Sequence, residues 1–236
     1  MSLRARLRGR LVRSVRRTEH RREFHLFDKY AERTMVPADR FVDNLLVAAR
    51  VANVPGAVVE CGTWRGGMIA ALAETLQHDP AGGERRQFVL FDSFQGLPPA
   101  GELDGEAARA WQADPTAPDH YDNCRADADE ARESMRMAGV HARFVEGWFD
   151  ETVPAYAGAH PEIALLRLDA DWYDSTIVCL RHLFPLVVPG GVVIIDDYGV
   201  GVFDGCTRAV HDYLSEARAT EYLRSTPHGV VYLVRR

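Results

Sequence analysis

The sequence predicts an α/β fold built on one mostly parallel sheet of seven strands, with helices on both faces. Short apolar runs at residues 163–168 and 192–195 are typical of strands that are buried on both faces of a parallel sheet. Residues 176–188 between them are long enough for one crossover helix, and the Pro-Gly-Gly at residues 189–191 then turns the chain back. Residues 56–60 form another apolar run, and the glycine-rich stretch after it indicates a strand, turn and helix that begin the sheet.

The remaining segments continue this alternation of strands and helices. We expect helices at residues 38–52, 68–77, 123–138 and 207–217, and strands at residues 87–91, 142–146, 221–224 and 229–234. The short link between the last two strands favours an antiparallel hairpin at the sheet edge. We expect a basic N-terminal arm at residues 1–29 and a single domain at residues 30–236. Residues 93–121, rich in Pro, Gly, Ala and Asp, are expected to be a lid or acceptor-binding insert over the ligand.

The composition is that of a globular protein with one core. The 236 residues are 47% hydrophobic, which suits a single large α/β domain. No apolar stretch approaches the ~18 residues that span a bilayer, so we expect a soluble protein without a membrane span. The four cysteines lack the spacing of zinc ligands, and we expect them to be reduced in a cytoplasmic protein. Because Lys29 is the only lysine, a P-loop nucleotidase is excluded.

Charge is distributed unevenly along the chain. The first 22 residues contain nine arginines, one glutamate and no lysine, so their net charge is about +8. Because the whole chain has a net charge of −6, the remaining residues carry about −14. An acidic body is not expected to bind nucleic acid. The basic arm lacks the apolar core of a signal peptide. Three interpretations stay open for it: a solvated or disordered arm, packing in the homo-oligomer that we expect, or docking on RNA or an anionic membrane.

Two of the expected strands end at carboxylates. Asp169 and Asp171 follow the first of them, and Asp196 and Asp197 follow the second. Neighbouring parallel strands lie ~4.8 Å apart, so if these two are adjacent, Asp169 meets Asp196 and Asp197 at one edge of the sheet. Crowded carboxylates repel one another unless a cation lies between them, and oxygen ligands suit a hard ion such as Mg²⁺. The alternative is that these aspartates cap helices or face water.

A second candidate site follows the strand at residues 56–60. Glu60 ends that strand, and the stretch ECGTWRGG offers backbone N–H groups to a ligand without matching GxGxxG. A carboxylate here suits a cationic ligand such as the amino-acid end of S-adenosylmethionine. Asp92 ends the next strand, where an acid can accept hydrogen bonds from a ribose. Trp148, after the strand expected at residues 142–146, could stack on a flat base. Each of these features also has a structural interpretation: helix packing for the turn, a helix cap for Asp92 and a core position for Trp148.

Five stretches in a fixed order resemble one protein family. They are ECGTWRGG, LFDSFQGLPP, VEGWFDET, LLRLDADWYDST and GGVVIIDDYG, the last followed by GCTRAVHDYL. Together they resemble the TylF-like O-methyltransferases, a family similar to the enzymes that methylate sugar hydroxyls on macrolide and aminocoumarin antibiotics. The resemblance covers about residues 34–236, and no feature of the family is carried over to the basic arm before Tyr30.

The resemblance implies a class I methyltransferase fold, which is Rossmann-like, with bound S-adenosylmethionine and Mg²⁺. By position it implies metal ligands at Asp169, Asp196 and Asp197, and a general base at Asp171. The implied cofactor contacts are Thr34, Met35, Glu60, Cys61, Gly62, Thr63, Trp64, Asp92, Ser93, Gln95, Gly96 and Trp148.

The reaction implied by the resemblance is methylation of a sugar hydroxyl on a glycosylated natural product or glycolipid. Methyl transfer to an alcohol is an in-line displacement, so the hydroxyl must be aligned and must lose its proton. A metal lowers the pKa of such a hydroxyl, and Asp171 is placed to take the proton unless it only caps the next helix. Two other functions stay open: methyl transfer to a catechol or another vicinal diol, and a non-catalytic module that docks on RNA or membrane through the arm.

Overall fold

The structure, a computed structural model, describes residues 15–77, 86–117, 120–202 and 204–236. Its centre is a seven-stranded sheet in the order β3-β2-β1-β4-β5-β7-β6. The strands are β1 (Ala57–Cys61), β2 (Phe88–Asp92), β3 (Arg143–Glu146), β4 (Ile163–Leu168), β5 (Val187–Ile195), β6 (Arg224–Ser225) and β7 (Val231–Val234). β1 to β5 pair in parallel, whereas β7 is antiparallel to both of its neighbours. This arrangement confirms the predicted α/β fold with an antiparallel C-terminal part.

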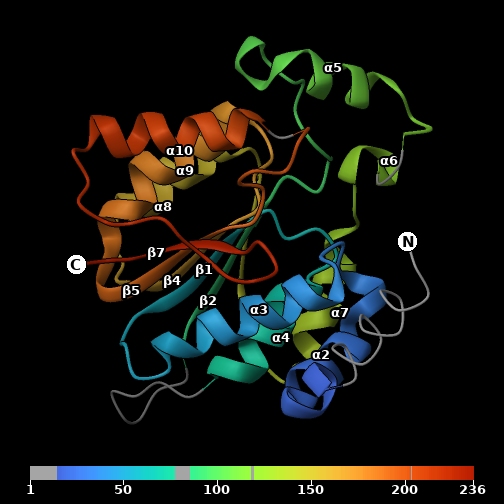
Figure 1. Ribbon diagram of the computed structural model, residues 1–236, viewed down its shortest axis with the longest axis vertical. Helices are drawn as coiled ribbons and strands as arrows, with labels where there is room; N and C mark the ends of the chain where they lie inside the picture. The colour runs from blue at the N-terminus through green and yellow to red at the C-terminus, as the bar shows by residue number, and fades with distance from the viewer. Residues whose placement is uncertain (1–14, 78–85, 118–119, 203) are drawn as a thin grey trace.

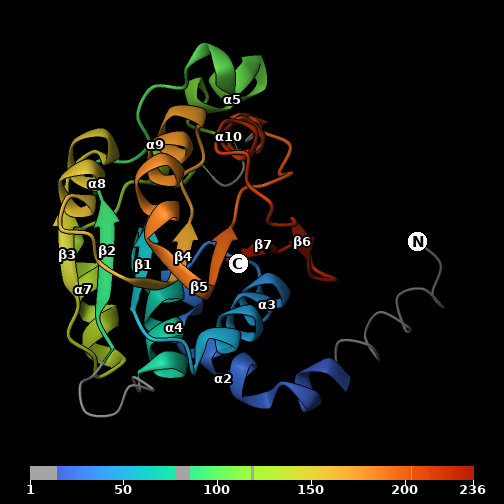
Figure 2. The same cartoon turned by 90° about the vertical axis from the view of Figure 1, so that its left-hand side faces the viewer.

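The sheet is the middle of three layers (Figure 1). Turned by 90°, the molecule shows α2, α3, α4 and α7 on one face and α8, α9 and α10 on the other (Figure 2). The long helices are α2 (Arg21–Tyr30), α3 (Ala38–Ala48), α4 (Gly67–Leu76), α5 (Gly105–Ala113), α7 (Ala128–Met137), α8 (Phe149–Ala157), α9 (Tyr173–Leu183) and α10 (Asp204–Glu216). Because helices cover both faces, every residue of β1 and β4 is buried, which explains their continuous apolar runs.

The register of the central strands brings their carboxyl ends to one edge of the sheet. Cys61, the last residue of β1, pairs with Phe91 of β2 and with Leu168 of β4. Leu168 in turn pairs with Ile195, the last residue of β5. The loops that follow these four strands therefore start side by side. The adjacency of β4 and β5 assumed from the sequence is correct.

The expected boundary between arm and domain, at residue 30, falls at the end of a helix that packs on the domain. Phe24, Leu26 and Tyr30 of α2 are buried, and α2 contacts α3 and α4. Lys29 also reaches the domain, because its Nζ lies 2.7 Å from a carboxylate oxygen of Glu74. Residues 21–30 are thus part of the core layer and not of a free arm, and the first half of the expected arm, residues 1–14, lies outside the described residues.

The helix expected at residues 123–138 begins later than the sequence suggested. Residues 121–124 form a short turn, α6 (Tyr121–Cys124), in which all four residues have positive φ, and the regular helix α7 starts at residue 128. Asp127 starts α7 with a capping box: its side chain accepts from Asp129 N, and Asp127 N donates to the Glu130 carboxylate. The Asp-x-x-Glu pattern is a sequence signal for this start.

The crossover between β4 and β5 also differs from the expectation of a helix at residues 176–188. Helix α9 ends at Leu183, because Pro185 cannot continue it, and η4 (Phe184–Leu186) leads directly into β5. The Pro-Gly-Gly at residues 189–191 is not a helix breaker but a bulge within β5, since Val187 pairs with Ile163 and Val192 with Leu165. The bulge is held to β7 by the hydrogen bond from Gly190 N to the Arg235 carbonyl, 2.8 Å.

The segment expected to be a lid or acceptor-binding insert, residues 93–121, contains η3 (Glu102–Asp104) and helix α5. Figure 1 shows α5 beyond the carboxyl ends of the strands, above the rest of the domain. Asp104 fastens the segment there, because its buried carboxylate accepts from Gly101 N and from Tyr173 N at the start of α9. A Cβ at Gly205 would lie 1.9 Å from an oxygen of Asp104, so the start of α10 packs tightly on the same carboxylate.

Three smaller expectations can be compared with the described residues. Their cysteines are free thiols, three of them buried and Cys124 half-buried beside the pocket described below. Among the described helices none is long and apolar enough to cross a membrane. The first closing strand is shorter than expected: β6 has two residues, and Glu221 makes an ion pair with Arg235 instead of joining the sheet.

Candidate active site

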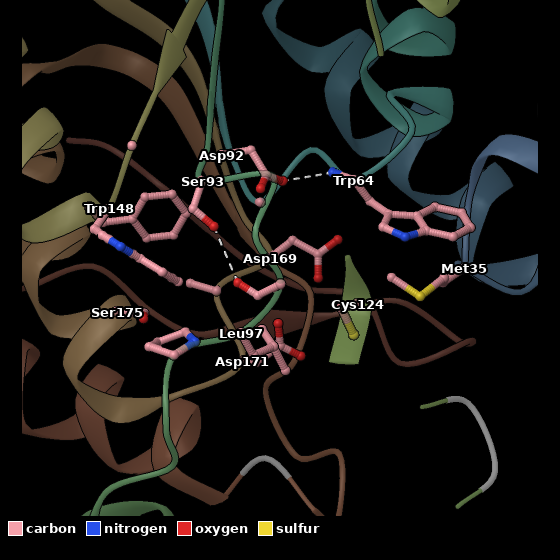
Figure 3. A pocket seen from close by; sticks show the side chains of 16 residues that line it. Met35, Trp64, Asp92, Ser93, Leu97, Cys124, Trp148, Asp169, Asp171 and Ser175 are labelled. Atoms are coloured by element: carbon pink, nitrogen blue, oxygen red, sulfur yellow. Dashed lines mark hydrogen bonds between the residues drawn. The ribbon is translucent and has the colours of Figure 1, made fainter. Parts of the chain in front are cut away.

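A pocket opens at the carboxyl edge of the sheet, where the loops after β1, β2, β3 and β4 meet (Figure 3). The space between its side chains is about 640 Å³, including a part open to solvent. Its lining residues are Met35, Gly62, Trp64, Asp92, Ser93, Gly96, Leu97, Pro98, Cys124, Gly147, Trp148, Phe149, Asp169, Ala170, Asp171 and Ser175.

The glycine-rich turn after β1 forms one wall of this pocket. Gly62 has φ +87°, and a Cβ there would lie 1.7 Å from the carbonyl oxygen of Asp169. Only glycine lets the β1 and β4 loops approach this closely. Gly66, with φ +77°, begins α4 in the left-handed region. The glycines of this predicted ligand-binding turn therefore also have a structural role, because they let the loop that carries Asp169 pack against the turn.

Asp92, at the end of β2, holds the glycine-rich turn in place. One of its carboxylate oxygens accepts from Thr63 N at 2.7 Å and Trp64 N at 2.8 Å, and the other accepts from Phe94 N at 2.7 Å. Burial raises the pKa of Asp92, while these backbone donors oppose that rise. The Trp64 bond is drawn in Figure 3, where Asp92 and Trp64 bound one side of the pocket.

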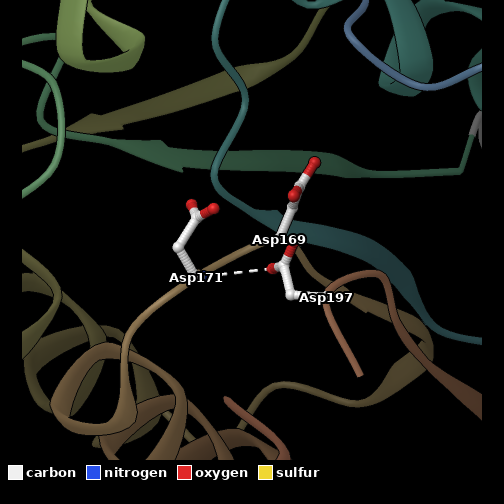
Figure 4. Close-up of side chains that lie close together, drawn as sticks. All are labelled: Asp169, Asp171 and Asp197. Carbon is white, nitrogen blue, oxygen red and sulfur yellow. Dashed lines mark hydrogen bonds between the residues drawn. The ribbon is translucent and has the colours of Figure 1, made fainter. Parts of the chain in front are cut away.

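The other side of the pocket is acidic. Asp169, Asp171 and Asp197 each offer a carboxylate oxygen, and these three atoms all lie within 4.8 Å of one another (Figure 4). Asp171 has φ +57°, and its backbone N–H donates to Asp197 at 3.1 Å, which fixes the turn that carries it. The strained left-handed conformation brings Asp171 back toward Asp169.

The electrostatics of this acidic cluster favour a bound cation. Burial raises the pKa of Asp169 to about 6, although the neighbouring Arg167 lowers it. Burial also raises the pKa of Asp171, with the negative charge of Asp169 adding to the rise, and that of Asp197, where Asp171 adds to it. Three oxygen donors that resist ionisation next to one another match the donor set of a hard divalent ion. The residues present therefore fit Mg²⁺.

Asp196, predicted as a metal ligand, lies elsewhere than in this cluster. Its Oδ1 is 3.1 Å from Arg167 Nη2 and 3.7 Å from Arg40 Nη2, and Asn44 Nδ2 lies at 3.4 Å. Successive residues at the end of β5 point to opposite sides, so Asp196 meets the α3 side and Asp197 the pocket side. The structure brings together Asp169, Asp171 and Asp197, and it pairs Asp196 with arginines.

Glu60 lies below the glycine-rich turn and is 1% exposed. Its Oε1 accepts from Arg167 Nη1 at 3.0 Å, while its Oε2 has no hydrogen-bond partner in the part of the chain that the structure describes. Burial raises the pKa of Glu60 to about 8, against the lowering effect of Arg167. An unpartnered carboxylate oxygen at this depth is the kind of atom that a bound cationic group or water would satisfy.

The predicted cofactor contacts divide into two groups. Those that line the pocket are Met35, Gly62, Trp64, Asp92, Ser93, Gly96 and Trp148, and those that do not are Thr34, Glu60, Cys61, Thr63 and Gln95. The Cys61 side chain is buried in the core on the α9 face, and Gln95 is exposed. Thr63 contributes its backbone N–H to Asp92 and not its side chain to the pocket.

The sequence analysis did not identify the buried polar residues that contact the carboxylates at the carboxyl edge of the sheet. Arg167 is fully buried within β4, and Arg40 and Asn44 of α3 reach the same group of carboxylates. A signal was present: an arginine inside an apolar strand that is buried on both faces must have carboxylate partners. Cys124 of α6 was also missed as a pocket residue, and burial raises the pKa of its thiol, which keeps it neutral.

Comparison with known proteins adds to this geometry. Residues 7–235 match the TylF family model, described as macrocin-O-methyltransferase. The chain is 34% identical to 8-demethyl-8-(2,3-dimethoxy-alpha-L-rhamnosyl)-tetracenomycin-C 4'-O-methyltransferase of Streptomyces olivaceus over 76% of its length. It is 35% identical to demethyldecarbamoylnovobiocin O-methyltransferase of Streptomyces niveus over the same share. These matches span 67% and 66% of the two relatives, or about two thirds of their length.

Solved structures agree on the fold. The O-methyltransferase NovP superposes with a TM-score of 0.70 at 32% identity, covering 86% of this chain and 82% of that one. MycE, a methyltransferase of the mycinamycin pathway solved with Mg, SAH and mycinamycin VI, gives a TM-score of 0.52 at 16% identity, covering 90% of this chain and 54% of that one. With a family model that matches nearly the whole chain, the protein belongs to the TylF family of O-methyltransferases.

Proposed function

We propose that this protein transfers a methyl group from S-adenosylmethionine to a sugar hydroxyl of a glycosylated natural product, with the help of a hard divalent ion such as Mg²⁺. The observation that carries the proposal is the pocket itself. The turn held by Asp92 forms one side, Asp169 and Asp171 line the other, and Asp197 completes the group of three carboxylates next to them. Relatives that are named as methyltransferases for glycosylated antibiotics support the acceptor class.

The residues on the Asp92 side suit S-adenosylmethionine. Asp92 stands where an acid can accept from a ribose, and Trp64, Met35 and Trp148 provide apolar walls. Glu60 lies outside the lining, beneath the turn, and adds negative charge under this side when it is ionised. When bound there, the cofactor supplies a methyl group attached to a positively charged sulfur. The chain's own contribution is to orient that group toward the acids and to exclude water around it.

The residues on the acidic side suit the acceptor hydroxyl and the ion. Asp169, Asp171 and Asp197 are the donors that would hold Mg²⁺ in this structure, with Asp196 next to them along the chain. The ion, when bound, lowers the pKa of a nearby alcohol and fixes its direction. Asp171 would accept the proton of that alcohol on a carboxylate oxygen while the alcohol oxygen bonds to the methyl carbon. The bond from that carbon to sulfur breaks at the same time, and its electron pair stays on the sulfur, which leaves as a neutral thioether.

We place recognition of the acceptor on the segment at residues 93–121. It contributes Leu97 and Pro98 to the wall next to the acids. The indole N–H of Trp172 donates to the Pro98 carbonyl at 2.9 Å, so this wall is attached to the residue that follows Asp171. A bulky aglycone above the sugar would then rest against α5 and α6, which lie beyond the carboxyl edge.

The proposal is tested by acceptor profiling of the full chain. Purified protein is incubated with S-adenosylmethionine and either a panel of deoxysugar glycosides or catechols, each with Mg²⁺ or with excess EDTA, and methylated products are measured by mass spectrometry. We expect product from a glycoside, in the presence of Mg²⁺ only. Methylation of catechols but not of glycosides would show that the acceptor is another vicinal diol and not a sugar. Full activity in EDTA would show that the reaction needs no divalent ion.

A non-catalytic role for the basic segment is tested in parallel. Its described part does not project freely, because Arg16 pairs with Asp39 and Asp43 of α3. Isothermal titration with S-adenosylhomocysteine gives the discriminating result. Steeply salt-dependent RNA binding without any heat from S-adenosylhomocysteine would favour a docking module over the proposed enzyme.

A further inference from the structure

One nitrogen atom joins the two sides of the site from below. Arg167 Nη1 lies 3.0 Å from Glu60 Oε1 and 2.9 Å from Asp169 Oδ2, so a single end of the guanidinium donates to both carboxylates. The Arg167 side chain is 1% exposed and Glu60 is equally buried. Glu60 is the last but one residue of β1, below the cofactor side of the pocket, and Asp169 follows β4 on the acidic side.

The rest of the guanidinium is held in a way that sets its direction. Arg167 Nε donates to Asn44 Oδ1 at 3.2 Å, and Nη2 lies 3.1 Å from Asp196 Oδ1. Asn44, fully buried, is itself fixed because its Nδ2 donates to the Arg40 carbonyl at 3.0 Å. Nε and Nη1 therefore donate hydrogen bonds in different directions, while Nη2 faces Asp196 as an ion pair and has no hydrogen-bond partner among the described residues. The site thus depends on the planar fork of arginine and not only on its charge.

From this geometry we infer that Arg167 is a positioning residue that couples the cofactor side of the site to the metal side. It holds Glu60 and Asp169 at a fixed separation on one nitrogen, so that displacement of one carboxylate displaces the other. The inference rests on the proposed function, because it assigns S-adenosylmethionine to the side of Glu60 and a divalent ion to the side of Asp169. Arg167 does not line the pocket and touches neither group directly.

The charge of the Arg167 guanidinium and its forked shape can be tested separately by substitution. A buried carboxylate that loses its cation is strongly destabilised, so removal of the charge risks loss of the fold. Lysine keeps the positive charge but offers one compact ammonium, which cannot donate to Glu60, Asp169, Asn44 and Asp196 in their present arrangement. Arg167→Lys therefore tests the fork while it preserves the charge.

The chain offers a matched control in Arg86. It is 2% exposed, as deeply buried as Arg167, but its guanidinium donates to the backbone carbonyls of Gly56, Val51 and Ala52 at 3.2 to 3.4 Å. These carbonyls lie before the start of β1, at the opposite edge of the sheet from the pocket. Arg86→Lys thus disturbs a buried arginine without touching either side of the site.

The experiment compares binding to the full chain and needs no turnover. S-adenosylhomocysteine affinity is measured by isothermal titration, and Mn²⁺ affinity, as a probe for the Mg²⁺ site, by electron paramagnetic resonance. We expect Arg167→Lys to weaken both by about tenfold or more, the scale of a lost charge-assisted hydrogen bond. Arg86→Lys is expected to leave both within about twofold while lowering the melting temperature.

The outcomes separate the inference from the proposed function. Wild-type protein that binds neither probe contradicts the proposed function, whatever the variants do. Wild-type protein that binds both, with Arg167→Lys bound as tightly as wild type, overturns the role of Arg167. Loss of only one of the two affinities would also overturn the coupling, because the shared nitrogen must affect both sides.

A second variant keeps the test decisive if Arg167→Lys does not fold. Glu60→Gln preserves the shape of the side chain and, at a pH above 8 where Glu60 is ionised, removes its charge, so Arg167 is drawn toward Asp169. We expect Mn²⁺ affinity measured without cofactor to fall about threefold or more, although Glu60 is absent from the acidic cluster. An Mn²⁺ affinity equal to that of wild type in Glu60→Gln would show that the two sides are independent.

Discussion

The two acidic ends of the pocket are built in opposite ways. At one end Asp92 accepts three backbone N–H groups, from Thr63, Trp64 and Phe94, at 2.7 to 2.8 Å. At the other end Asp169, Asp171 and Asp197 gather their oxygens within 4.8 Å, and no donor to the Asp171 carboxylate is found among the described residues. Both ends consist of aspartates that follow buried strands, so the difference lies in their partners.

This difference separates what the fold stabilises from what a ligand must stabilise. The charge of Asp92 is compensated by the chain itself, so its first role is to shape the glycine-rich turn. The charges of the acidic cluster are compensated only in part, by Arg167 beside Asp169. We expect substitutions at the Asp92 end to act on the turn and on cofactor affinity, and substitutions in the cluster to act on the ion and on the chemical step.

The largest expected effect is at Asp171. Asp171→Asn removes the proton acceptor but preserves the size of the side chain, so turnover should fall by about 10²-fold or more. The affinity for S-adenosylhomocysteine should stay within about twofold, because Asp92 and its turn are untouched. Single-turnover rates and isothermal titration measure the two quantities. Asp174→Asn, an exposed neighbour on α9, is the matched control, and wild-type turnover in Asp171→Asn would exclude the base.

The second effect distinguishes the two aspartates after β5. Asp197 belongs to the acidic cluster, whereas Asp196 lies against Arg167 and Arg40. We expect Asp197→Asn to weaken Mn²⁺ binding by about tenfold or more, and Asp196→Asn to weaken it less. Electron paramagnetic resonance titrations give both values. An equal or larger loss in Asp196→Asn would mean that Asp196 leaves Arg167 when the ion binds, as the resemblance to the family implied.

The third effect is at the opposite end of the pocket. Asp92→Asn places an amide NH₂ where one carboxylate oxygen now accepts N–H groups, so at least one of the three bonds is lost. A hydrogen bond to a charged group contributes about 1.5–3 kcal/mol, so S-adenosylhomocysteine affinity should fall roughly 10- to 100-fold. Mn²⁺ affinity should change little. If Asp92→Asn weakened Mn²⁺ as much as S-adenosylhomocysteine, the two ends would not be separable.

The sequence predicted the carboxyl edge of the sheet well because the relevant signals are local. Apolar runs that stop at acids, with a crossover between them, fix β4 and β5 as neighbours and bring Asp169 close to Asp197. The glycine-rich turn and Asp92 follow the same logic. Gly62 shows why the turn requires glycine: its positive φ and its contact with the Asp169 carbonyl both exclude a side chain.

What the sequence did not predict depends on contacts between distant segments. The choice between Asp196 and Asp171 as a member of the cluster is set by Arg167, Asn44 and Arg40, two of which lie on α3. The left-handed turn of α6 and the fastening of α5 by Asp104 also depend on partners far along the chain. The sequence of residues 93–121 has no periodicity that would indicate these partners. The segment is held by individual hydrogen bonds and not by a repeated apolar face.

The smallest expected effect is on stability, and its sign follows from the raised pKa values. Burial raises the pKa of Asp169 to about 6 and that of Glu60 to about 8, both above the ordinary range of acids. The folded protein therefore binds more protons than the unfolded chain in this interval, so stability is present at low pH and is lost as the pH rises toward 8. Between pH 5 and 8 we expect the melting temperature of metal-free protein to fall by a few degrees.

Saturating Mg²⁺ should reduce that fall, because an ion among Asp169, Asp171 and Asp197 stabilises their ionised forms. Differential scanning fluorimetry at constant ionic strength, with Mg²⁺ or EDTA, measures both slopes. Glu60→Gln is the control for the cofactor side: it should flatten the metal-free slope between pH 5 and 8 while it leaves the stabilisation by Mg²⁺ at pH 8 detectable. A melting temperature that rose with pH in EDTA would mean that these acids are ionised in the folded protein without an added cation, and that Arg167 and Arg40 suffice to balance them.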